Sequence, residues 1–250
     1  MMKPLFSLFL VLFLFSCGSQ DSSSVQKEKE ATPEPEVSVG NSCLADLVES
    51  NEIEKMISID QVAELAAITV DEVEMEDNKS STAKYSTIKY SWEPEEERTF
   101  TLEMKVGDRT ISQSAPLKNS IDVGMIEIVE AVGDRTPLEI FDLTYGPKTQ
   151  AQKQKDKAAV DRAQESSGQV DESSADVIKA MVDKINYTKV EDTGTRAYGS
   201  VQKVSGLVFY NLYVLHGNTM FEVTTDVSDY SEEDVLMAKL VAQQIVANCE

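Results

Sequence analysis

Residues 207–227 read LVFYNLYVLHGNTMFEVTTDV and form the most regular part of the chain. Residues 207–215 are apolar on both faces, which is typical of a strand at the centre of a sheet. Gly217-Asn218 fits a two-residue hairpin turn, and residues 220–227 then return as a second strand. This stretch therefore predicts an antiparallel hairpin inside a larger sheet.

Helical patterns lie on both sides of the predicted sheet. Residues 231–247 predict a C-terminal helix whose apolar stripe extends to Cys249. At the other end, residues 44–57 repeat apolar side chains at three- and four-residue spacing. Ser58 and Gln61 then match a capping box, which predicts the start of a second short helix. We expect these terminal helices to pack on the sheet.

The middle of the chain follows the two-residue period of β-strands. Gly107-Asp108 fits a turn that leads the clearest strand back toward Ile111. Together these runs predict a single α+β domain with an antiparallel meander that exposes one face to water. The expected strands are residues 73–76, 88–92, 99–106, 125–129 and 138–145, the first of them half-buried.

The polar stretch at residues 147–173 fits either a solvent-exposed helix or a mobile insertion, and its sequence does not decide between them. Ser173 and Asp176 predict the start of a following helix. Residues 129–135 and 190–196 share Val, Glu, Gly and Arg in register, and each precedes a strand pattern. This similarity fits either the duplication of a strand-turn-strand unit or chance.

The first residues have the order of an export signal. Lys3 precedes an unbroken apolar run, Leu5–Phe15, and Ser16 supplies the small residue of a cleavage site. As a helix this run of 11 residues spans about 16 Å, too short for a bilayer core of about 30 Å. Leu14, Ser16 and Cys17 resemble the lipobox of a bacterial lipoprotein.

The lipoprotein resemblance implies removal of residues 1–16 and acylation of Cys17. Phe15 departs from the usual lipobox, so a plain secretory signal with an unmodified Cys17 is the alternative. The resemblance also implies three acyl chains, which would anchor the protein in a lipid bilayer, because two membrane signals already give stable attachment. Gly18, rather than Asp, resembles the signal for sorting to the outer membrane.

Residues 18–40 are rich in Ser, Lys, Glu and Pro and predict a flexible tether with a typical span of roughly 25–30 Å. Residues 41–250 then form the expected domain. Three cysteines would leave one reactive thiol in an exported protein. Lipidation of Cys17 leaves Cys43 and Cys249, which can pair in an oxidising compartment and tie the first helix to the last.

Several short features resemble a loosely defined group of bacterial envelope lipoproteins. The resemblance covers most of residues 43–249 and implies an α+β domain without a known activity. The matching features are Cys43-Leu44, Tyr90-x-Trp92, Gly217-Asn218 and Val190-x-x-x-Gly194-x-x-Ala197-Tyr198.

Charge and motifs exclude several functional classes. Without residues 1–16, the chain has 22 basic and 44 acidic side chains, a net charge of −22, and no contiguous basic patch for a nucleic-acid backbone. It has no phosphate-binding glycine loop, and the acidic run Asp71–Asp77 lacks the residue order of a calcium loop. The single histidine, His216, lies at the predicted hairpin turn, where we expect an exposed residue rather than a catalytic base.

The sequence therefore favours a non-enzymatic binding or structural module without a cofactor, a metal site or catalytic residues. Its expected partners are the lipid bilayer and an envelope protein, and nucleic acid is not among them. An envelope hydrolase acting on glycans or peptides is the alternative, because 44 carboxylates offer many acid–base pairs. The aromatic residues that fit either a ligand cleft or core packing are Trp92, Tyr198, Tyr210 and Tyr213.

Overall fold

The computed structural model describes residues 43–107, 109–167, 171–184, 186–204, 207–229 and 231–249. These residues belong to two compact units. One unit contains residues 151–182, and the other contains residues 43–150 and 183–249. The predicted signal sequence, Cys17 and the tether lie outside the described residues.

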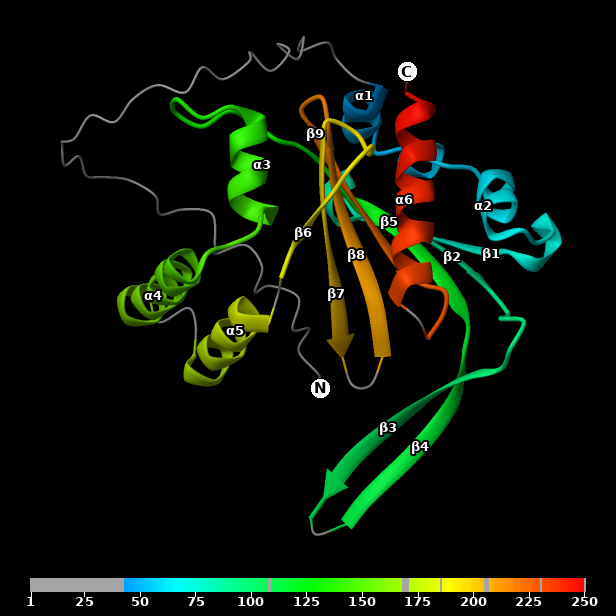
Figure 1. Ribbon diagram of the computed structural model, residues 1–250, viewed down its shortest axis with the longest axis horizontal. Helices are drawn as coiled ribbons and strands as arrows, with labels where there is room; N and C mark the ends of the chain where they lie inside the picture. Colours follow the sequence, from blue (N-terminus) through cyan, green and yellow to red (C-terminus); the bar gives the residue numbers. More distant parts are fainter. Residues whose placement is uncertain are drawn as a thin grey trace. The chain divides into compact units, whose positions relative to one another are not determined.

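The larger unit is built on a seven-stranded antiparallel sheet with the strand order β1-β2-β5-β9-β8-β7-β6 (Figure 1). The hairpin predicted from residues 207–227 is β8 (Leu207–His216) and β9 (Thr219–Asp226), and Gly217 adopts a positive φ of 61° at its turn. The predicted α+β class and the antiparallel sheet are confirmed. The remaining strands of the sheet are β1 (Glu74–Asn78), β2 (Thr87–Trp92), β5 (Asn119–Ile128), β6 (Thr188–Val190) and β7 (Arg196–Val204).

The strand order differs from a simple meander. β6, β7, β8 and β9 follow one another along the chain and across the sheet, and β1 pairs with β2. The two groups are joined because β5 pairs with both β2 and β9. Local sequence patterns do not specify such a partnership, since it connects strands that are far apart in the chain.

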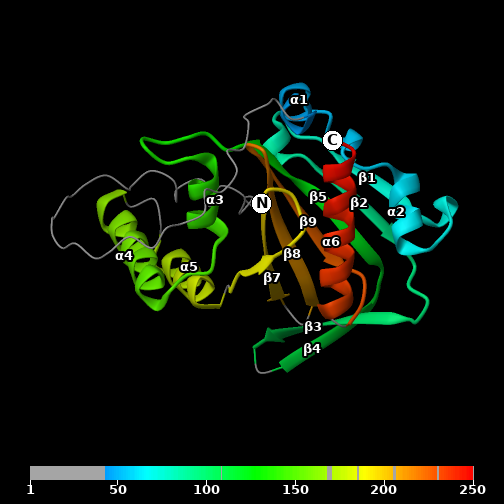
Figure 2. The ribbon, with the colours of Figure 1, turned by 45° about the horizontal axis from the view of Figure 1, so that its top comes forward.

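Helices cover one face of this sheet and enclose the main core. α6 (Ser231–Ala247) lies across β8 and β9, and α2 (Ile59–Ala66) packs beside it (Figures 1 and 2). α1 (Cys43–Ser50) contacts β5, and a short 3-10 helix, η2 (Ile53–Lys55), follows it. The buried strand residues of this core are Ile88, Tyr90, Trp92, Ile121, Val123, Ile126, Ala197, Tyr210, Leu212, Val214, Phe221 and Val223.

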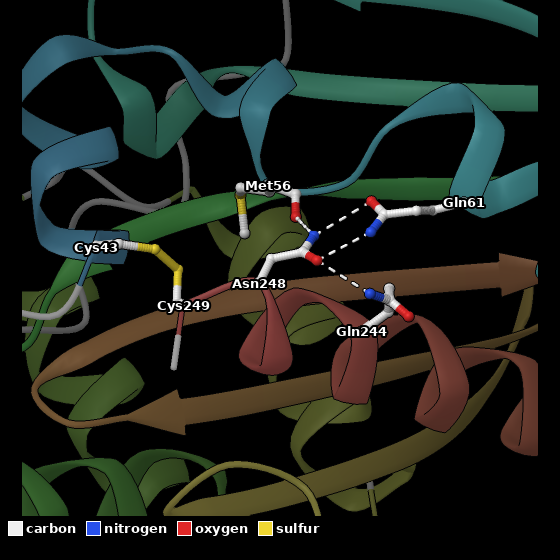
Figure 3. The surroundings of a disulfide bond; sticks show 6 residues. All are labelled: Cys43, Met56, Gln61, Gln244, Asn248 and Cys249. Carbon is white, nitrogen blue, oxygen red and sulfur yellow. Dashed lines mark hydrogen bonds between the residues drawn. A yellow bond between two sulfur atoms is a disulfide. The ribbon is translucent and has the colours of Figure 1, made fainter.

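The N-terminal helices and the end of α6 are joined covalently and by hydrogen bonds (Figure 3). The predicted disulfide between Cys43 and Cys249 is present, with 5.3 Å between the two Cα atoms. The Asn248 side chain donates to the Met56 carbonyl at 2.9 Å and accepts from Gln61 Nε2 at 2.9 Å. Two kinds of contact therefore hold the same helix end.

The predicted capping box at the start of α2 is also confirmed. Gln61 N–H donates to Ser58 Oγ at 3.2 Å, while Ser58 N–H donates to Gln61 Oε1 at 2.9 Å. Two otherwise unpaired backbone donors of the helix end are satisfied in this way. The helix closes at Ala67, which has the left-handed conformation with φ 56°.

The strand predicted at residues 138–145 is wrong, because this segment forms α3 (Pro137–Tyr145). Thr136 Oγ1 accepts from Glu139 N–H, and Pro137 occupies the first turn, where its missing N–H is harmless. These helix-start signals favour a helix more strongly than the apolar run favours a strand. Consequently residues 129–135 precede a helix, whereas residues 190–196 precede β7, and the proposed strand-turn-strand duplication does not hold.

β1 also differs from its prediction as a half-buried strand. All five of its residues are exposed, and Met75 is 50% exposed. β1 is the edge strand of the sheet, with β2 as its neighbour. Val73, which precedes β1, is the residue of this segment that enters the core.

The clearest predicted strand, residues 99–106, pairs outside the main sheet. β3 (Arg98–Val106) and β4 (Arg109–Leu117) form a separate two-stranded sheet that extends away from the other strands (Figure 1). Of the predicted turn, Gly107 has φ 62°, and Asp108 lies outside the described residues.

Arg98 fixes the base of this two-stranded sheet. Its side chain is 8% exposed, forms an ion pair with Asp226, and donates to Asn119 Oδ1 at 2.9 Å and to the Ser228 carbonyl at 3.0 Å. Burying a cation requires such partners, since an unpaired buried charge is strongly destabilising. The sheet is thus tied to the end of β9.

The smaller unit consists of helices. α4 (Gln150–Ser167) and α5 (Glu172–Lys184) share a small apolar cluster of Val160, Ala175 and Ile178, and Asp161 pairs with Lys179. Residues 150–167 of the polar stretch at 147–173 therefore form a helix, α4. Ser174 N–H donates to Asp171 Oδ1 at 2.9 Å, so Asp171, rather than the predicted Ser173, caps α5. No helix within the described residues is long and apolar enough to cross a membrane.

Candidate functional site

The sheet face opposite α6 carries a row of polar residues. Cross-strand pairing places one residue from each of six neighbouring strands directly opposite the next, because side chains at paired positions share a face. From β1 to β7 the row consists of Glu76, Lys89, Asp122, Thr224, Asn211 and Ser200. We call these residues the polar row.

Glu222 lies beside the polar row. It is paired with Tyr213 on β8 and with Gly124 on β5. Because Glu222 is two residues from Thr224 along β9, it lies on the same sheet face as the polar row. Its carboxylate accepts a hydrogen bond from Asn211 Nδ2, and the same Nδ2 lies 3.5 Å from the Tyr213 hydroxyl. The orientation of the Asn211 amide is therefore fixed, because its NH2 group must face the carboxylate.

Two buried oxygens of the polar row have no hydrogen-bond partner among the described residues. They are Asn211 Oδ1, on a side chain that is 8% exposed, and Ser200 Oγ, on a side chain that is 2% exposed. Ser200 and Asn211 are directly paired across β7 and β8. Because a buried polar atom without a partner costs about 1–3 kcal/mol, such atoms need an explanation.

A cluster of aromatic residues borders the polar row. Tyr145 of α3 stacks on Tyr213 with 4.3 Å between ring centroids, and Tyr187 meets both rings edge-on. Phe141 of α3 stacks on Tyr198, whose hydroxyl donates to Asp142 at 2.9 Å. α3 therefore closes one end of this sheet face with rings.

A bulge in β5 supports this arrangement. The register shifts between Gly124 and Glu127, and Met125 takes a positive φ of 48°. A bulge inserts an extra residue and changes which face the following side chains occupy. As a result, Met125 packs with the aromatic cluster, while Ile126 lies in the main core.

Burial raises the pKa of two carboxyl groups on this face. The pKa of Glu222 is raised by burial and by the charge of Asp122, while hydrogen bonds from Tyr213 and Asn211 oppose the rise. Burial likewise raises the pKa of Asp122, the charge of Lys89 opposes the rise, and Glu76 adds to it. Taking a carboxylate out of water without a full counter-charge favours its neutral form.

Around Ser200, Asn211 and Glu222 this face presents hydrogen-bond acceptors. Carboxylate, amide and hydroxyl oxygens converge beside tyrosine rings, and within the described residues no group of three or more His, Cys, Asp or Glu side chains is arranged to hold a metal ion. The expectation of no metal site and no cofactor stays a prediction. The arrangement suits the binding of a polar ligand that donates hydrogen bonds.

His216, the last residue of β8, lies elsewhere, in a shallow depression of about 460 Å³. Its other lining residues are Asp192, Gly194, Thr195, Gln243, Val246 and Ala247. Thr195 Oγ1 accepts from Gly217 N–H at 3.1 Å and Gln243 donates to the Asp192 carbonyl at 2.8 Å. These polar groups are used to hold the loops, and the lining contains no serine beside His216.

The four aromatic residues considered as a ligand cleft in the sequence lie in two different clusters. Trp92 and Tyr210 lie in the main core, so these two aromatic residues do not line a ligand site. Tyr198 and Tyr213 lie on the opposite face in the aromatic cluster. Asp71–Asp77 is spread over the short helix η3 (Val70–Glu72) and β1.

The local sequence patterns did not identify Asp122, Ser200, Asn211 and Glu222 as candidate site residues. One signal was available, since Asn211 interrupts the apolar run 207–215 of β8 and Glu222 interrupts the apolar run 220–223 of β9. Their convergence with Ser200 and Asp122 required the register of β5 and β7, which local sequence does not specify.

Comparison of the chain with protein-family models, with curated proteins and with solved structures found no match. A functional proposal therefore rests on the residues of this chain alone.

Proposed function

We propose that this protein is a cell-envelope lipoprotein, anchored by acylation of Cys17, whose α+β domain is a non-enzymatic binding module. The observation that carries the proposal is the Cys43–Cys249 disulfide. Disulfides persist in oxidising compartments such as the periplasm and the cell surface. With two of the three cysteines used in this bond, Cys17 is the one left, and it stands at the lipobox position.

The charge of the protein supports lipid anchoring over electrostatic attachment. The net charge of −22 without residues 1–16 would repel an anionic membrane surface. Acyl chains supply attachment that does not depend on charge. Gly18 favours the outer membrane as the destination, and the tether would hold the domain clear of the headgroups.

The sheet face with the polar row and Glu222 is the surface that best supports binding. It carries unpartnered acceptors beside a group of aromatic rings, and these are features of a ligand site. An envelope ligand or an envelope protein partner that donates hydrogen bonds would be recognised there.

Substitution of the lipid-accepting cysteine tests the anchoring. Cys17→Ala should abolish the acyl mass and move the protein from the membrane to the soluble fraction of fractionated cells. The matched control, Cys43→Ala with Cys249→Ala, should keep both the acyl mass and the membrane location. Membrane retention of Cys17→Ala without any acyl mass would contradict the proposal.

One observation favours the second candidate, a hydrolase of envelope glycans or peptides. Asp122 and Glu222 are two carboxyl groups on one sheet face, and burial raises the pKa of both, as general acid catalysis requires. Hydrogen bonds from Asn211 and Tyr213 engage the Glu222 carboxylate, which suits a binding residue better than a free acid. Release of reducing ends from cell-wall glycan by the wild type, and none by Glu222→Gln, would favour the hydrolase.

A further inference from the structure

The unpartnered oxygens of the polar row define a specific hydrogen-bonding pattern. Asn211 Oδ1 cannot turn toward Glu222, because the amide NH2 group already faces that carboxylate. Directly opposite on β7, Ser200 Oγ is also unpartnered among the described residues. With the carboxylate of Glu222, three acceptor groups lie next to one another across three strands.

We propose that Ser200, Asn211 and Glu222 bind the primary ammonium group of an envelope ligand. An ammonium group carries three N–H donors and no acceptor, so three adjacent acceptors satisfy it completely. A ligand carboxylate or phosphate would be repelled by the Glu222 carboxylate and could not donate to Asn211 Oδ1. This inference rests on the proposed binding function of this face and names the chemistry of its ligand.

Among the described residues, the charged groups around the site leave Glu222 without a positive partner. The groups that act on the pKa of Glu222 are Tyr213, Asn211 and Asp122, and none of these is positively charged. Tyr145 of α3 and Tyr187 face the same carboxylate, and both are neutral phenols whose pKa is raised. On the neighbouring strand, Asp122 already has Lys89 as its partner across the register. A ligand ammonium would provide the counter-charge that Glu222 lacks.

The burial of the site favours an ammonium group at the end of a narrow chain. Ser200 and Asn211 are both more than nine-tenths buried, whereas Glu222 is half-buried. A lysine side chain in an envelope peptide presents its ammonium group on four methylenes, and these suit the neighbouring tyrosine rings. An amino sugar carries the same ammonium group on a broad ring. We therefore expect the lysine-type amine to bind more tightly.

Isothermal titration of the purified full-length chain in detergent tests this inference. The probes are Nα-acetyl-lysine amide and glucosamine, and their uncharged counterparts are Nα-acetyl-norleucine amide and glucose. Glu222→Gln and Asn211→Leu should each weaken binding of the lysine probe roughly 10- to 100-fold, as expected for loss of a charge-assisted hydrogen bond. Glu64→Gln removes the same charge from the exposed surface of α2, on the helix-covered face of the sheet, and should change affinity less than about twofold.

A pH titration of the wild-type protein tests the inference without depending on the folding of any variant. Binding of the lysine probe should weaken as the pH falls, because protonation of Glu222 removes the charge that holds the ammonium group. Binding of either amine above its uncharged counterpart supports the inference, and the preferred probe identifies the ligand type. Equal binding of the charged and uncharged probes, or wild-type affinity in Glu222→Gln, would overturn it.

The same preparations separate this inference from the proposed function. If the acylated protein is found in membranes but binds neither amine, the ammonium site is wrong and the anchoring stands. If amine binding is intact but Cys17 carries no acyl group, the anchoring is wrong and the site stands.

Discussion

Loss of the Cys43–Cys249 disulfide should greatly lower the stability of the larger unit. The bond closes a loop with a sequence separation of 206 residues. In the chain-entropy model, opening a loop of this length restores about 5 kcal/mol of conformational freedom to the unfolded chain. We therefore expect Cys43→Ala with Cys249→Ala to lower the free energy of unfolding by about 3–5 kcal/mol.

The native structure should survive this change. Asn248 still joins the end of α6 to Met56 and Gln61, so the helix ends remain in place without the sulfur atoms (Figure 3). Leu44 of α1 is also fully buried in the main core. Most of the stability change should consequently arise in the unfolded state.

Urea titration followed by tryptophan fluorescence measures this effect. Trp92 is the one tryptophan of the chain and is 5% exposed in the main core, so its emission reports unfolding of the larger unit. With a urea m value of about 2–3 kcal/mol per molar, the midpoint should fall by about 2 M. Reduction of the wild type should give the same shift as the double substitution. A midpoint change below about 0.5 M in both would refute the loop-closure reasoning.

Two further predictions concern single residues of the helices. Ala67→Gly should raise the free energy of unfolding by about 1 kcal/mol, because glycine accepts the left-handed conformation at φ 56° without strain. Ala66→Gly, at the last residue of α2, should lower the free energy of unfolding by a similar amount. If urea titration gave both changes the same sign, this reasoning would be contradicted. Burial raises the pKa of Asp234 to about 6 from its ordinary 3.8. The folded chain thus binds this proton more tightly than the unfolded chain, and the free energy of unfolding should fall by about 2–3 kcal/mol as the pH rises from 4 to above 6. In Asp234→Asn this part of the pH dependence should disappear, and a pH profile identical to that of the wild type would show that another group is responsible.

Local sequence signals predicted many elements of this fold. Ser58 and Gln61 predicted a helix start because capping involves residues three positions apart, and the apolar alternation around Gly217 predicted β8 and β9 for a similarly local reason. The failure at residues 138–145 was also local, since Thr136, Pro137 and Glu139 form a helix start that the apolar run obscured. The cysteine pairing followed from counting cysteines and was confirmed by the structure.

The candidate site could not be predicted in the same way. The candidate site residues come from four strands, and they share one region of a sheet face only because of the register between those strands: Asp122, Ser200, Asn211 and Glu222. A shift of one residue in any strand would turn its side chain to the opposite face. The bulge at Met125 adds to this dependence, because it changes the alternation of β5 within a single strand.

The sequence by itself determined the α+β fold class, the terminal helices, the β8–β9 hairpin and the pairing of Cys43 with Cys249. Periodicity, caps and cysteine number suffice for these, because they are properties of short segments or of the whole composition. Only the tertiary structure decided that β5 lies between β2 and β9 and that Ser200, Asn211 and Glu222 are neighbours. Those contacts depend on packing between distant parts of the chain, where the burial of one whole sheet face selects a single register.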